Sequence, residues 1–571
     1  MSGPQVGAAL DTDTRWFCGQ SQEHALSQSA DQAHPTYDVD DAVNRLRADY
    51  DMTPYTSNSY PQSAPGQLAA VAYLFGLETR EVATARVLEI GCGAGGNLIP
   101  FAAAHPRARV VGIDLSQVQI DHGRPRVHAL GLDNLRLLAG DIARMNLAEL
   151  GQFDFVIAHG VYSWVPIEVQ EALLSAFRRL LAPEGVAYVS YNVYPGWKSK
   201  EILRDAMLLA SGGSVTPDEK VRNARHMVDF LEDVAPADSA LARILAESRA
   251  HALGYGDSDL LHVELETFNS PCYFYEMVGR AAAHGLTYLA EAHPEAMIPA
   301  NYGPKVAEYL NEKCAGVQVL VEQYLDFVAD RTFRESLLVH AERAPRIRYD
   351  PHHGRYRRLH IAARVPPAEG QTRLDHSRQE YLYSDGATLF TNDPGIKAAL
   401  DALTARWPCT LSWQELVDAV KARLVSAGLN PRDKLPDHID GLMEVLILQG
   451  QARFRLDPVL PEPAPALLRL DETARRMAEL TRMESDASTF NLWHETLTLS
   501  PVDRHLLPLL DGTRDRNALV EALLAINREN PIGIQRDGKP VSGEGELRDA
   551  LTEHIDEMPQ RLAEMMLWRV G

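Results

Sequence analysis

The stretch that most constrains this chain is residues 86–97, which read Arg-Val-Leu-Glu-Ile-Gly-Cys-Gly-Ala-Gly-Gly-Asn. A short β-forming run, residues 87–90, leads into the glycines, and an apolar helical segment, residues 98–104, follows them. Glycines at such a turn let the backbone reach positive φ and let a ligand approach main-chain N–H groups with no Cβ in the way. The stretch therefore predicts a strand, a tight turn and a helix that cradle a nucleotide-like cofactor.

The spacing of these glycines fits two classes of cofactor. Gly91, Gly93 and Gly96 satisfy the G-x-G-x-x-G pattern of dinucleotide-binding folds, but that match alone is weak. Glu89 stands two residues before the first glycine, and Gly95 adds a tighter glycine spacing. Because a carboxylate at this place suits an ammonium group better than a pyrophosphate, the turn favours S-adenosylmethionine.

Two acidic residues follow further strand-like runs. Residues 109–114 form a second apolar strand that ends in Asp114, about 20 residues after the turn, where a carboxylate can accept both ribose hydroxyls. Residues 135–138 form a third strand that leads into Gly140 and Asp141, and Asp141 can accept from an adenine amino group. The Asp114 position fits either cofactor class, so it supports a nucleoside-containing cofactor without choosing between them.

Strands and helices alternate from residue 86 to residue 192. Residues 153–158 read as a buried strand that opens into the His159 loop, residues 167–181 as an amphipathic helix, and residues 186–192 as a further strand. This alternation predicts a parallel sheet wound on both faces, with ligands bound outside the carboxyl ends of the strands. The glycine turn, both acidic residues, the His159 loop and the loop after Asn192 all fall at those ends.

These landmarks together resemble the class I methyltransferases, whose features occur here in order as the Glu89–Gly95 run, Asp114, Gly140-Asp141 and the strand that contains Asp154. Three further runs, at residues 55–62, 158–166 and 191–197, resemble bacterial methyltransferases that carry a methyltransferase regulatory domain. That family includes rickettsial protein-lysine methyltransferases acting on outer-membrane proteins. The similarity runs from about residue 45 onward, and it implies an α/β, doubly wound, seven-stranded Rossmann-like methyltransferase domain.

The pattern and the resemblance together predict the site residues. The expected cofactor-binding residues are Glu89, Gly91, Gly93, Gly95, Asn97, Asp114, Leu115, Asp141, Ile142, His159 and Gly160. The expected substrate-binding residues are Tyr55, Tyr60, Tyr162, Trp164, Asn192, Tyr194 and Trp197, and the candidate catalytic residues are Tyr162, Tyr194 and His159. Alternatives stay open: Tyr55 and Tyr60 as packing residues, Trp164 and Trp197 as core anchors, and His159 as a source of main-chain contacts only.

The aromatic residues among these have a chemical rationale. With a reference pKa near ~10.4, on the order of one lysine amine in a thousand is neutral at pH 7, which costs roughly 4 to 5 kcal/mol. Desolvation in an aromatic pocket lowers the pKa of such an amine and favours its reactive form. Aromatic rings also offer cation–π contact to charged forms of the side chain. Tyr162 and Tyr194 are therefore the favoured substrate contacts.

Composition limits the partners and the setting of this 571-residue chain. Its net charge of -22 argues against binding a nucleic-acid backbone, which needs a basic face. Its 5 cysteines are widely spaced, and neither they nor the histidines show metal-ligand spacing, so no metal is expected. No run approaches the ~18 apolar residues that a membrane helix needs, and the start lacks the pattern of a secretory signal. We expect a cytoplasmic protein with no membrane insertion.

The expected domains are a disordered leader (1–40), the methyltransferase domain (41–212), a mostly helical regulatory domain (213–343), a winged-helix-like module (344–456) and a second C-terminal module (457–571). The winged-helix-like reading rests on a helix, helix, strand order at residues 413–455, and its helices lack the basic stripe that DNA binding requires. The proline-rich residues 457–465 predict a stiff linker between the last two modules.

The function that follows is S-adenosylmethionine-dependent methyl transfer, with S-adenosylhomocysteine as the product. The resemblance implies a lysine side chain of a surface or outer-membrane protein as the acceptor. One alternative is methyl transfer to nitrogen or oxygen of a small molecule or peptide. Another, of a different class, is a non-catalytic scaffold or sensor that only binds the cofactor. The sequence does not identify the acceptor, the degree of methylation or the oligomeric state.

Overall fold

The computed structural model describes residues 38–252, 260–350, 353–461, 467–536, 539–541 and 543–567. The chain divides into two compact units, Met1–Arg45 and Leu46–Gly571. In the first unit, Asp38 precedes helix α2 (Val39–Met52) and its Oδ1 accepts from the backbone N–H groups of Asp40 and Asp41, as a helix N-cap does. Most of the predicted disordered leader, with Cys18, lies outside the described residues.

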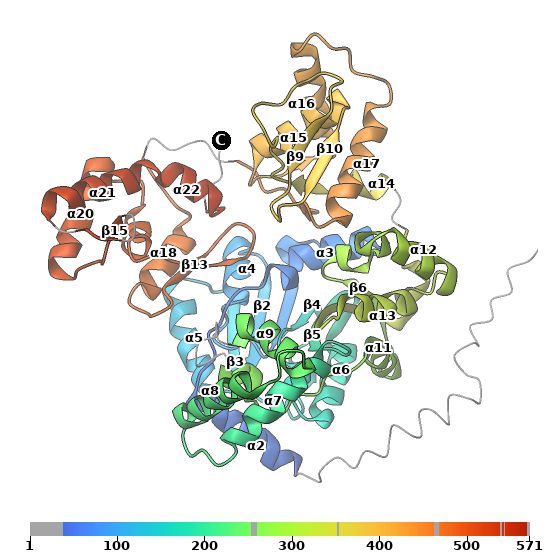
Figure 1. Cartoon of the computed structure of the whole chain (residues 1–571), viewed down its shortest axis with the longest axis vertical. Coiled ribbons are helices and arrows are strands. Elements are labelled where there is room, and N and C mark those ends of the chain that lie inside the picture. The colour runs from blue at the N-terminus through green and yellow to red at the C-terminus, as the bar shows by residue number, and fades with distance from the viewer. Residues whose placement is uncertain are drawn as a thin grey trace, which may run out of the picture. The chain divides into compact units, whose positions relative to one another are not determined.

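A seven-stranded sheet lies at the centre of the second unit (Figure 1). Its strand order is β3 (Leu135–Ala139), β2 (Arg109–Asp114), β1 (Arg86–Ile90), β4 (Phe153–Ala158), β5 (Leu181–Asn192), β7 (Phe333–His340) and β6 (Leu286–Glu291). The first five strands pair in parallel, and β7 pairs antiparallel with both β5 and β6. This architecture confirms the predicted seven-stranded, Rossmann-like methyltransferase fold.

Helices cover the sheet because its strands are apolar on both faces. All six residues of β4 are buried, which is typical of a parallel strand with a helical layer on each side. The helices that pack on the parallel strands are α3 (Pro65–Leu74), α4 (Leu98–Ala104), α5 (Gln117–Ala129) and α6 (Ile167–Leu180). A single hydrophobic core joins them to the strands, with Leu68, Phe155 and Phe177 fully buried within it.

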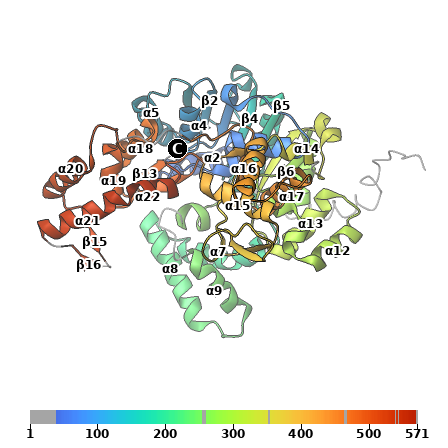
Figure 2. The ribbon, with the colours of Figure 1, turned by 90° about the horizontal axis from the view of Figure 1, so that it is seen from above.

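The chain between β5 and β7 is mostly helical, as expected for the middle region. Its helices are α7 (Trp197–Ser211), α8 (Pro217–Val234), α9 (Ala240–Ala252), α11 (Phe274–Ala283), α12 (Pro304–Lys313) and α13 (Gln318–Ala329). Helices α7, α8 and α9 contact one another and share a small core of their own (Figure 1, Figure 2). This region also contains β6, so two strands of the sheet, β6 and β7, lie beyond residue 212.

A fully buried arginine ties the middle region to the sheet. Arg334 on β7 donates to Asp326 on α13, to Glu322 on the same helix, and to Glu291 on β6. The guanidinium also lies 3.7 Å from the ring centroid of Phe274 on α11. Three buried carboxylates thus share one cation, which neutralises part of the charge that burial would otherwise penalise.

The remaining chain forms two further groups of elements. The first contains α14 (His353–Tyr356), β8 (His360–Ala362), the hairpin of β9 (Gln379–Leu382) and β10 (Thr388–Thr391), α15 (Pro394–Arg406), β11 (Leu411–Ser412), α16 (Trp413–Ser426), α17 (Leu435–Leu448) and β12 (Arg453–Arg455). The α16, α17, β12 order confirms the predicted helix, helix, strand pattern, and β9 pairs antiparallel with β10.

The second group surrounds a separate core that includes Leu506, Leu523 and Leu562. Its elements are α18 (Glu472–Thr481), β13 (Ser488–Phe490), β14 (Thr496–Thr498), α19 (Asp503–Leu506), α20 (Arg516–Glu529), β15 (Gln535–Arg536), β16 (Lys539–Pro540), α21 (Glu544–Asp556) and α22 (Met558–Glu564). Across the described ranges, no helix combines the length and the apolar character needed to cross a membrane.

Candidate active site

The glycine turn after β1 has the backbone that the sequence predicted. Gly91, Gly93 and Gly95 have φ values of 77°, 53° and 84°, in the left-handed region that favours glycine. The N–H groups of Gly91 and Cys92 both donate to Ile113 O on β2, at 2.8 and 3.1 Å. A methyl group added at Gly91 would lie 2.3 Å from Val161 Cγ2, so a larger residue would displace Val161 and would also be strained at this positive φ.

Glu89 is buried at the carboxyl end of β1 and has only one oxygen in use. Its Oε1 accepts from Asn97 Nδ2 at 2.7 Å, whereas its Oε2 is buried and without a hydrogen-bond partner in the described part of the chain. Burial, with a further contribution from Asp114, raises the pKa of Glu89 to about 8, against the opposing effect of the Asn97 hydrogen bond. A buried carboxylate with a vacant oxygen is suited to a cationic ligand, and the ammonium group of S-adenosylmethionine fits it.

Asp114 and Asp141 occupy the ends of β2 and β3. Asp114 Oδ2 accepts from Gly93 N at 2.7 Å, which fixes the carboxylate against the glycine turn, and its Oδ1 accepts from Ser116 N. Gly140 N donates to Asp114 O at 2.8 Å, so the two strand ends meet. Asp141 accepts from Ala143 N, and Ile142 beside it is buried. The structure therefore brings together the residues predicted to hold a nucleoside, with Leu115 next to Asp114.

The loop at residues 55–62 closes over the glycine turn. Ser57 Oγ accepts from Gly96 N at 2.8 Å, and Tyr60 N donates to Asn97 Oδ1 at 2.9 Å. The Tyr60 ring stacks on the His159 ring with 3.8 Å between centroids, while Tyr55 packs edge-on to His262. The Asn97 side chain therefore binds both Glu89, through its amide nitrogen, and the loop, through its amide oxygen.

His159 follows β4 and takes part in a chain of hydrogen bonds. Its Nδ1 lies 2.9 Å from the Tyr188 hydroxyl, which donates to Glu335 Oε1 at 2.8 Å. The Tyr188 hydroxyl donates its proton to Glu335, so it can only accept a hydrogen bond from His159. Nδ1 must therefore carry the imidazole proton, and Nε2 has a lone pair. Burial lowers the pKa of His159 to about 4, so the ring is neutral at physiological pH.

Glu335 connects this chain to two other segments. Gln62 Nε2 donates to Glu335 Oε1 at 2.8 Å, and His293 Nε2 lies 3.4 Å from Glu335 Oε2. Glu335 belongs to β7 and Tyr188 to β5, and Tyr188 pairs with Leu337 across the two strands. The middle region thus supplies a carboxylate to the network around His159.

Gly160 and Asn192, at the ends of β4 and β5, are each held by the side chain of another segment. Gly160 has a φ of 66°, and its N–H donates to Ser190 Oγ at 2.7 Å. Asn192 is buried at the end of β5, where its Nδ2 donates to Asn269 Oδ1 at 2.8 Å. Their predicted roles in binding cofactor and substrate remain predictions.

The predicted aromatic residues differ in exposure. Tyr162 is fully buried, and its hydroxyl accepts from Arg280 Nη1 at 3.4 Å. Trp197 is also buried and meets the ring of the half-buried Trp164 edge-on at 6.1 Å. Tyr194 is half-buried and donates to Glu201 Oε1 at 2.6 Å. Burial favours a packing role for Tyr162 and Trp197, and it leaves Tyr194 and Trp164 as the more accessible pair.

Four residues of this site carried no clear signal in the sequence. Tyr188 lies within an apolar strand, Glu335 lies more than 140 residues after it, and Ser57 is one of several polar residues in a loop. His494, described below, lies 397 residues from its partner Asn97. Among the described residues, no group of three or more His, Cys, Asp or Glu side chains is arranged to hold a metal ion.

Three family models match different parts of the chain. A methyltransferase domain matches residues 87–185, a predicted methyltransferase regulatory domain matches residues 256–340, and a PKMT C-terminal winged helix domain matches residues 473–567. The first match contains the glycine turn and His159, and the second contains β6, β7 and Glu335. The winged helix match falls on α18–α22, whereas the sequence pattern suggested such a module at residues 344–456.

RP789 and PKMT2 both align with most of this chain, and RP028 aligns with a smaller part. RP789 of Rickettsia prowazekii, an uncharacterized protein, is 30% identical over 90% of this chain and 92% of its own length. RP028 of the same organism is 34% identical over 41% of this chain and 93% of its own length. The structure of PKMT2 from Rickettsia typhi in complex with AdoHcy matches with a TM-score of 0.80 and 25% identity, covering 90% of this chain and 100% of that chain.

Proposed function

We propose that this chain methylates lysine side chains of a protein substrate. It belongs to the family of S-adenosylmethionine-dependent methyltransferases that carry a methyltransferase regulatory domain and a PKMT C-terminal winged helix domain. The resemblance to rickettsial protein-lysine methyltransferases extends the proposal to surface or outer-membrane proteins as substrates. We further propose that it acts in the cytoplasm.

The observation that carries this proposal is the neutral His159 imidazole at the edge of the glycine turn. Strand β4, which His159 follows, pairs with β1, and Val161 packs against Gly91. Tyr60 joins the two sides because its ring stacks on His159 while its backbone N–H binds Asn97. An acceptor nitrogen held at His159 therefore lies next to the predicted cofactor cradle.

The residues of the cradle have distinct roles when the cofactor is bound. Glu89 would hold the ammonium group through Oε2, Asp114 the ribose hydroxyls, and Asp141 with Ile142 the adenine. S-adenosylmethionine supplies a methyl group that its sulfonium already makes electrophilic. The protein therefore contributes mainly position and environment.

His159 is suited to orient the acceptor amine rather than to act as the base that takes up the proton of that amine. With a pKa near 4 it is a much weaker base than a lysine amine, whose reference pKa is ~10.4. As a neutral ring it can accept a hydrogen bond at Nε2 from a neutral amine N–H, which leaves the amine lone pair free for transfer. A neutral ring also adds no positive charge to a site that must hold a cationic cofactor.

Methyl-labelled cofactor distinguishes this proposal from its alternatives. The protein is incubated with labelled S-adenosylmethionine and lysate of the source organism, and labelled residues are mapped by mass spectrometry. We expect label on lysines of a discrete set of proteins. Label only in the small-molecule fraction would favour a small-molecule methyltransferase, and no label despite cofactor binding would favour a sensor or scaffold.

A further inference from the structure

The hairpin of β13 and β14 in the C-terminal module contacts the cofactor site directly. Thr496 Oγ1 accepts from Ser59 N at 2.8 Å, and His494 Nε2 lies 2.9 Å from Asn97 Oδ1. Both contacts reach residues that the sequence places more than 390 positions away. Neither the methyltransferase match nor the glycine motif includes the hairpin.

The donor and the acceptor in the His494 contact are fixed by the neighbouring groups. Tyr60 N is a donor, so the atom it meets must be Asn97 Oδ1, and the amide nitrogen must be the atom that meets Glu89 Oε1. His494 Nε2 therefore carries a proton and donates to Oδ1. The ring is neutral, because burial, with Arg455 and His105 contributing, lowers the pKa of His494 to about 3.

The hairpin presents His494 from a rigid turn. Asn491 Oδ1 accepts from the N–H groups of Trp493 and Glu495, and Trp493 Nε1 donates to Pro408 O at 3.0 Å. His494 itself has a φ of 66°, which is uncommon for any residue other than glycine. Such a conformation persists where the surroundings hold it, and it is often associated with function.

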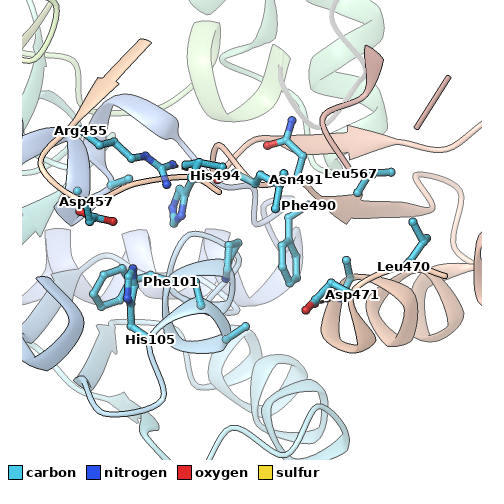
Figure 3. Close-up of a pocket in the computed structure, with 18 of the residues that line it drawn as sticks. Phe101, His105, Arg455, Asp457, Leu470, Asp471, Phe490, Asn491, His494 and Leu567 are labelled. Atoms are coloured by element: carbon cyan, nitrogen blue, oxygen red, sulfur yellow. Dashed lines mark hydrogen bonds between the residues drawn. The ribbon is translucent and has the colours of Figure 1, made fainter. Parts of the chain in front are cut away.

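The His494 contact with Asn97 lies beside a cavity. A cavity of about 750 Å³ separates α4 from the hairpin and the preceding segment, with Phe101 and His105 on one side and Arg455 and Phe490 on the other (Figure 3). His494 lies in the wall of that cavity and is itself buried. The histidine thus bridges to Asn97 from the wall of the cavity.

We propose that His494 is a positioning residue of the cofactor site, which sets the Asn97 amide so that Glu89 presents its vacant oxygen to the ammonium group of the cofactor. The Asn97 amide makes four hydrogen bonds: its oxygen accepts from Tyr60 N and His494 Nε2, and its nitrogen donates to Glu89 and Ser63. Loss of His494 removes one of the four, so the amide is held less tightly in the position that contacts Glu89. The C-terminal module then acts on cofactor affinity without touching the cofactor. The inference rests on the cofactor site and holds whatever the methyl acceptor is.

The test is the affinity of the full chain for S-adenosylhomocysteine, measured by calorimetry. His494→Gly removes the donor, so we expect affinity to fall about tenfold. Relief of the positive φ offsets part of the stability that is lost with the buried side chain, and the melting temperature shows that the variant is folded. Thr498→Ala, on the exposed end of the same hairpin, is the matched control and should bind as the unaltered protein does. His494→Asn, which also tolerates positive φ but is too short to reach Asn97, serves if the glycine variant does not fold.

A double-mutant cycle with Asn97→Ala shows whether His494 acts through the amide. If it does, the double variant binds no more weakly than Asn97→Ala alone, whereas independent effects would multiply. The pH at which binding is half-maximal should also move upward in His494→Gly, because a looser Asn97 bond lets the pKa of Glu89 rise. Unchanged affinity in His494→Gly, or effects that multiply in the cycle, would overturn the proposal.

Discussion

His159 Nδ1 lies 2.9 Å from the hydroxyl of Tyr188, a residue one strand away that is buried completely within the sheet. The contact fixes the tautomer of the imidazole, with the proton on Nδ1 and a lone pair on Nε2. Tyr188 is in turn held by Glu335 from the middle region. The orientation of the candidate catalytic ring therefore depends on two residues that are not at the carboxyl ends of parallel strands.

Replacing Tyr188 with Phe should slow methyl transfer and spare cofactor binding. Without the hydroxyl, Nδ1–H has no acceptor and the ring can take the other tautomer, so we expect kcat to fall roughly tenfold. Affinity for S-adenosylhomocysteine should change less than about twofold. Tyr191→Phe is the matched control, because Tyr191 is equally buried on β5 but its hydroxyl contacts Ser336 instead. Equal rates for the two variants would remove Tyr188 from this role.

Binding of the cofactor should release a proton from Glu89. In the free protein the pKa of Glu89 is about 8, so about 0.9 of the molecules hold a proton on it at pH 7. A bound ammonium group favours the ionised carboxylate, which lowers that pKa. Calorimetry in buffers of different ionisation enthalpy should therefore show close to one proton released at pH 7, and affinity should rise with pH up to about 8.

Glu89→Gln provides the control for this release and a test of its effect on stability. The variant should bind the cofactor more weakly and release no proton from this position. In the free protein the raised pKa of Glu89 means that the folded state keeps a proton which the unfolded state loses near pH 4.5. Stability should accordingly fall as pH rises from about 4.5 to about 8, and Glu89→Gln should flatten that part of the profile. A release that persists in the variant would assign the proton elsewhere.

Gly96→Ala should displace the loop at residues 55–62. A methyl group there would lie 2.1 Å from Ser57 O, and Gly96 N is the donor that holds Ser57 Oγ. We expect cofactor affinity to fall at least tenfold, and protease cleavage within the loop to become faster. Gly213→Ala, where an added methyl group meets nothing within 4 Å, should leave both measurements unchanged. Normal affinity in Gly96→Ala would show that the loop does not contribute to the cofactor site.

Arg334→Ala should strongly destabilise the fold. The change leaves Glu291, Glu322 and Asp326 buried without their shared cation, and the loss of one partner from a buried ionic network costs on the order of 3 to 5 kcal/mol. Chemical denaturation should show this loss, or the variant should fail to accumulate as folded protein. Arg358→Ala, which breaks an exposed pair with Glu78, should have little effect.

The sequence predicted the parallel part of the sheet well because its strands are short, apolar and separated by glycine and proline turns. Local sequence patterns located the five parallel strands, the glycine turn and the helices α16 and α17. Strands β6 and β7 were not located in this way, because residues 286–291 lie between helical segments and β7 pairs antiparallel with strands far away in the chain. Strand order across long insertions is a tertiary property that local periodicity does not encode.

Residues of the candidate site could be proposed from the sequence where they follow a motif, and not where they depend on contacts between distant parts of the chain. Glu89, Asp114 and Asp141 could be inferred because each stands at a fixed place relative to a strand end. Glu335 and His494 reach the site from β7 and from a C-terminal hairpin, and no spacing relates them to the glycine turn. The exposure of the aromatic residues could likewise not be read from the sequence, since it depends on which loops cover them.

The antiparallel pairing of β7 with β5 means that a strand from the middle region completes the sheet of the methyltransferase domain. A fragment that stops at residue 212 would end with β5 as an uncovered edge, open to pairing with other chains. A different segment in place of β7 would have to match the hydrogen-bond register along β5 to cover this edge. Tyr188 lies within the β5–β7 pairing and contacts the His159 imidazole. The strand that completes the sheet therefore also helps to hold this imidazole in place.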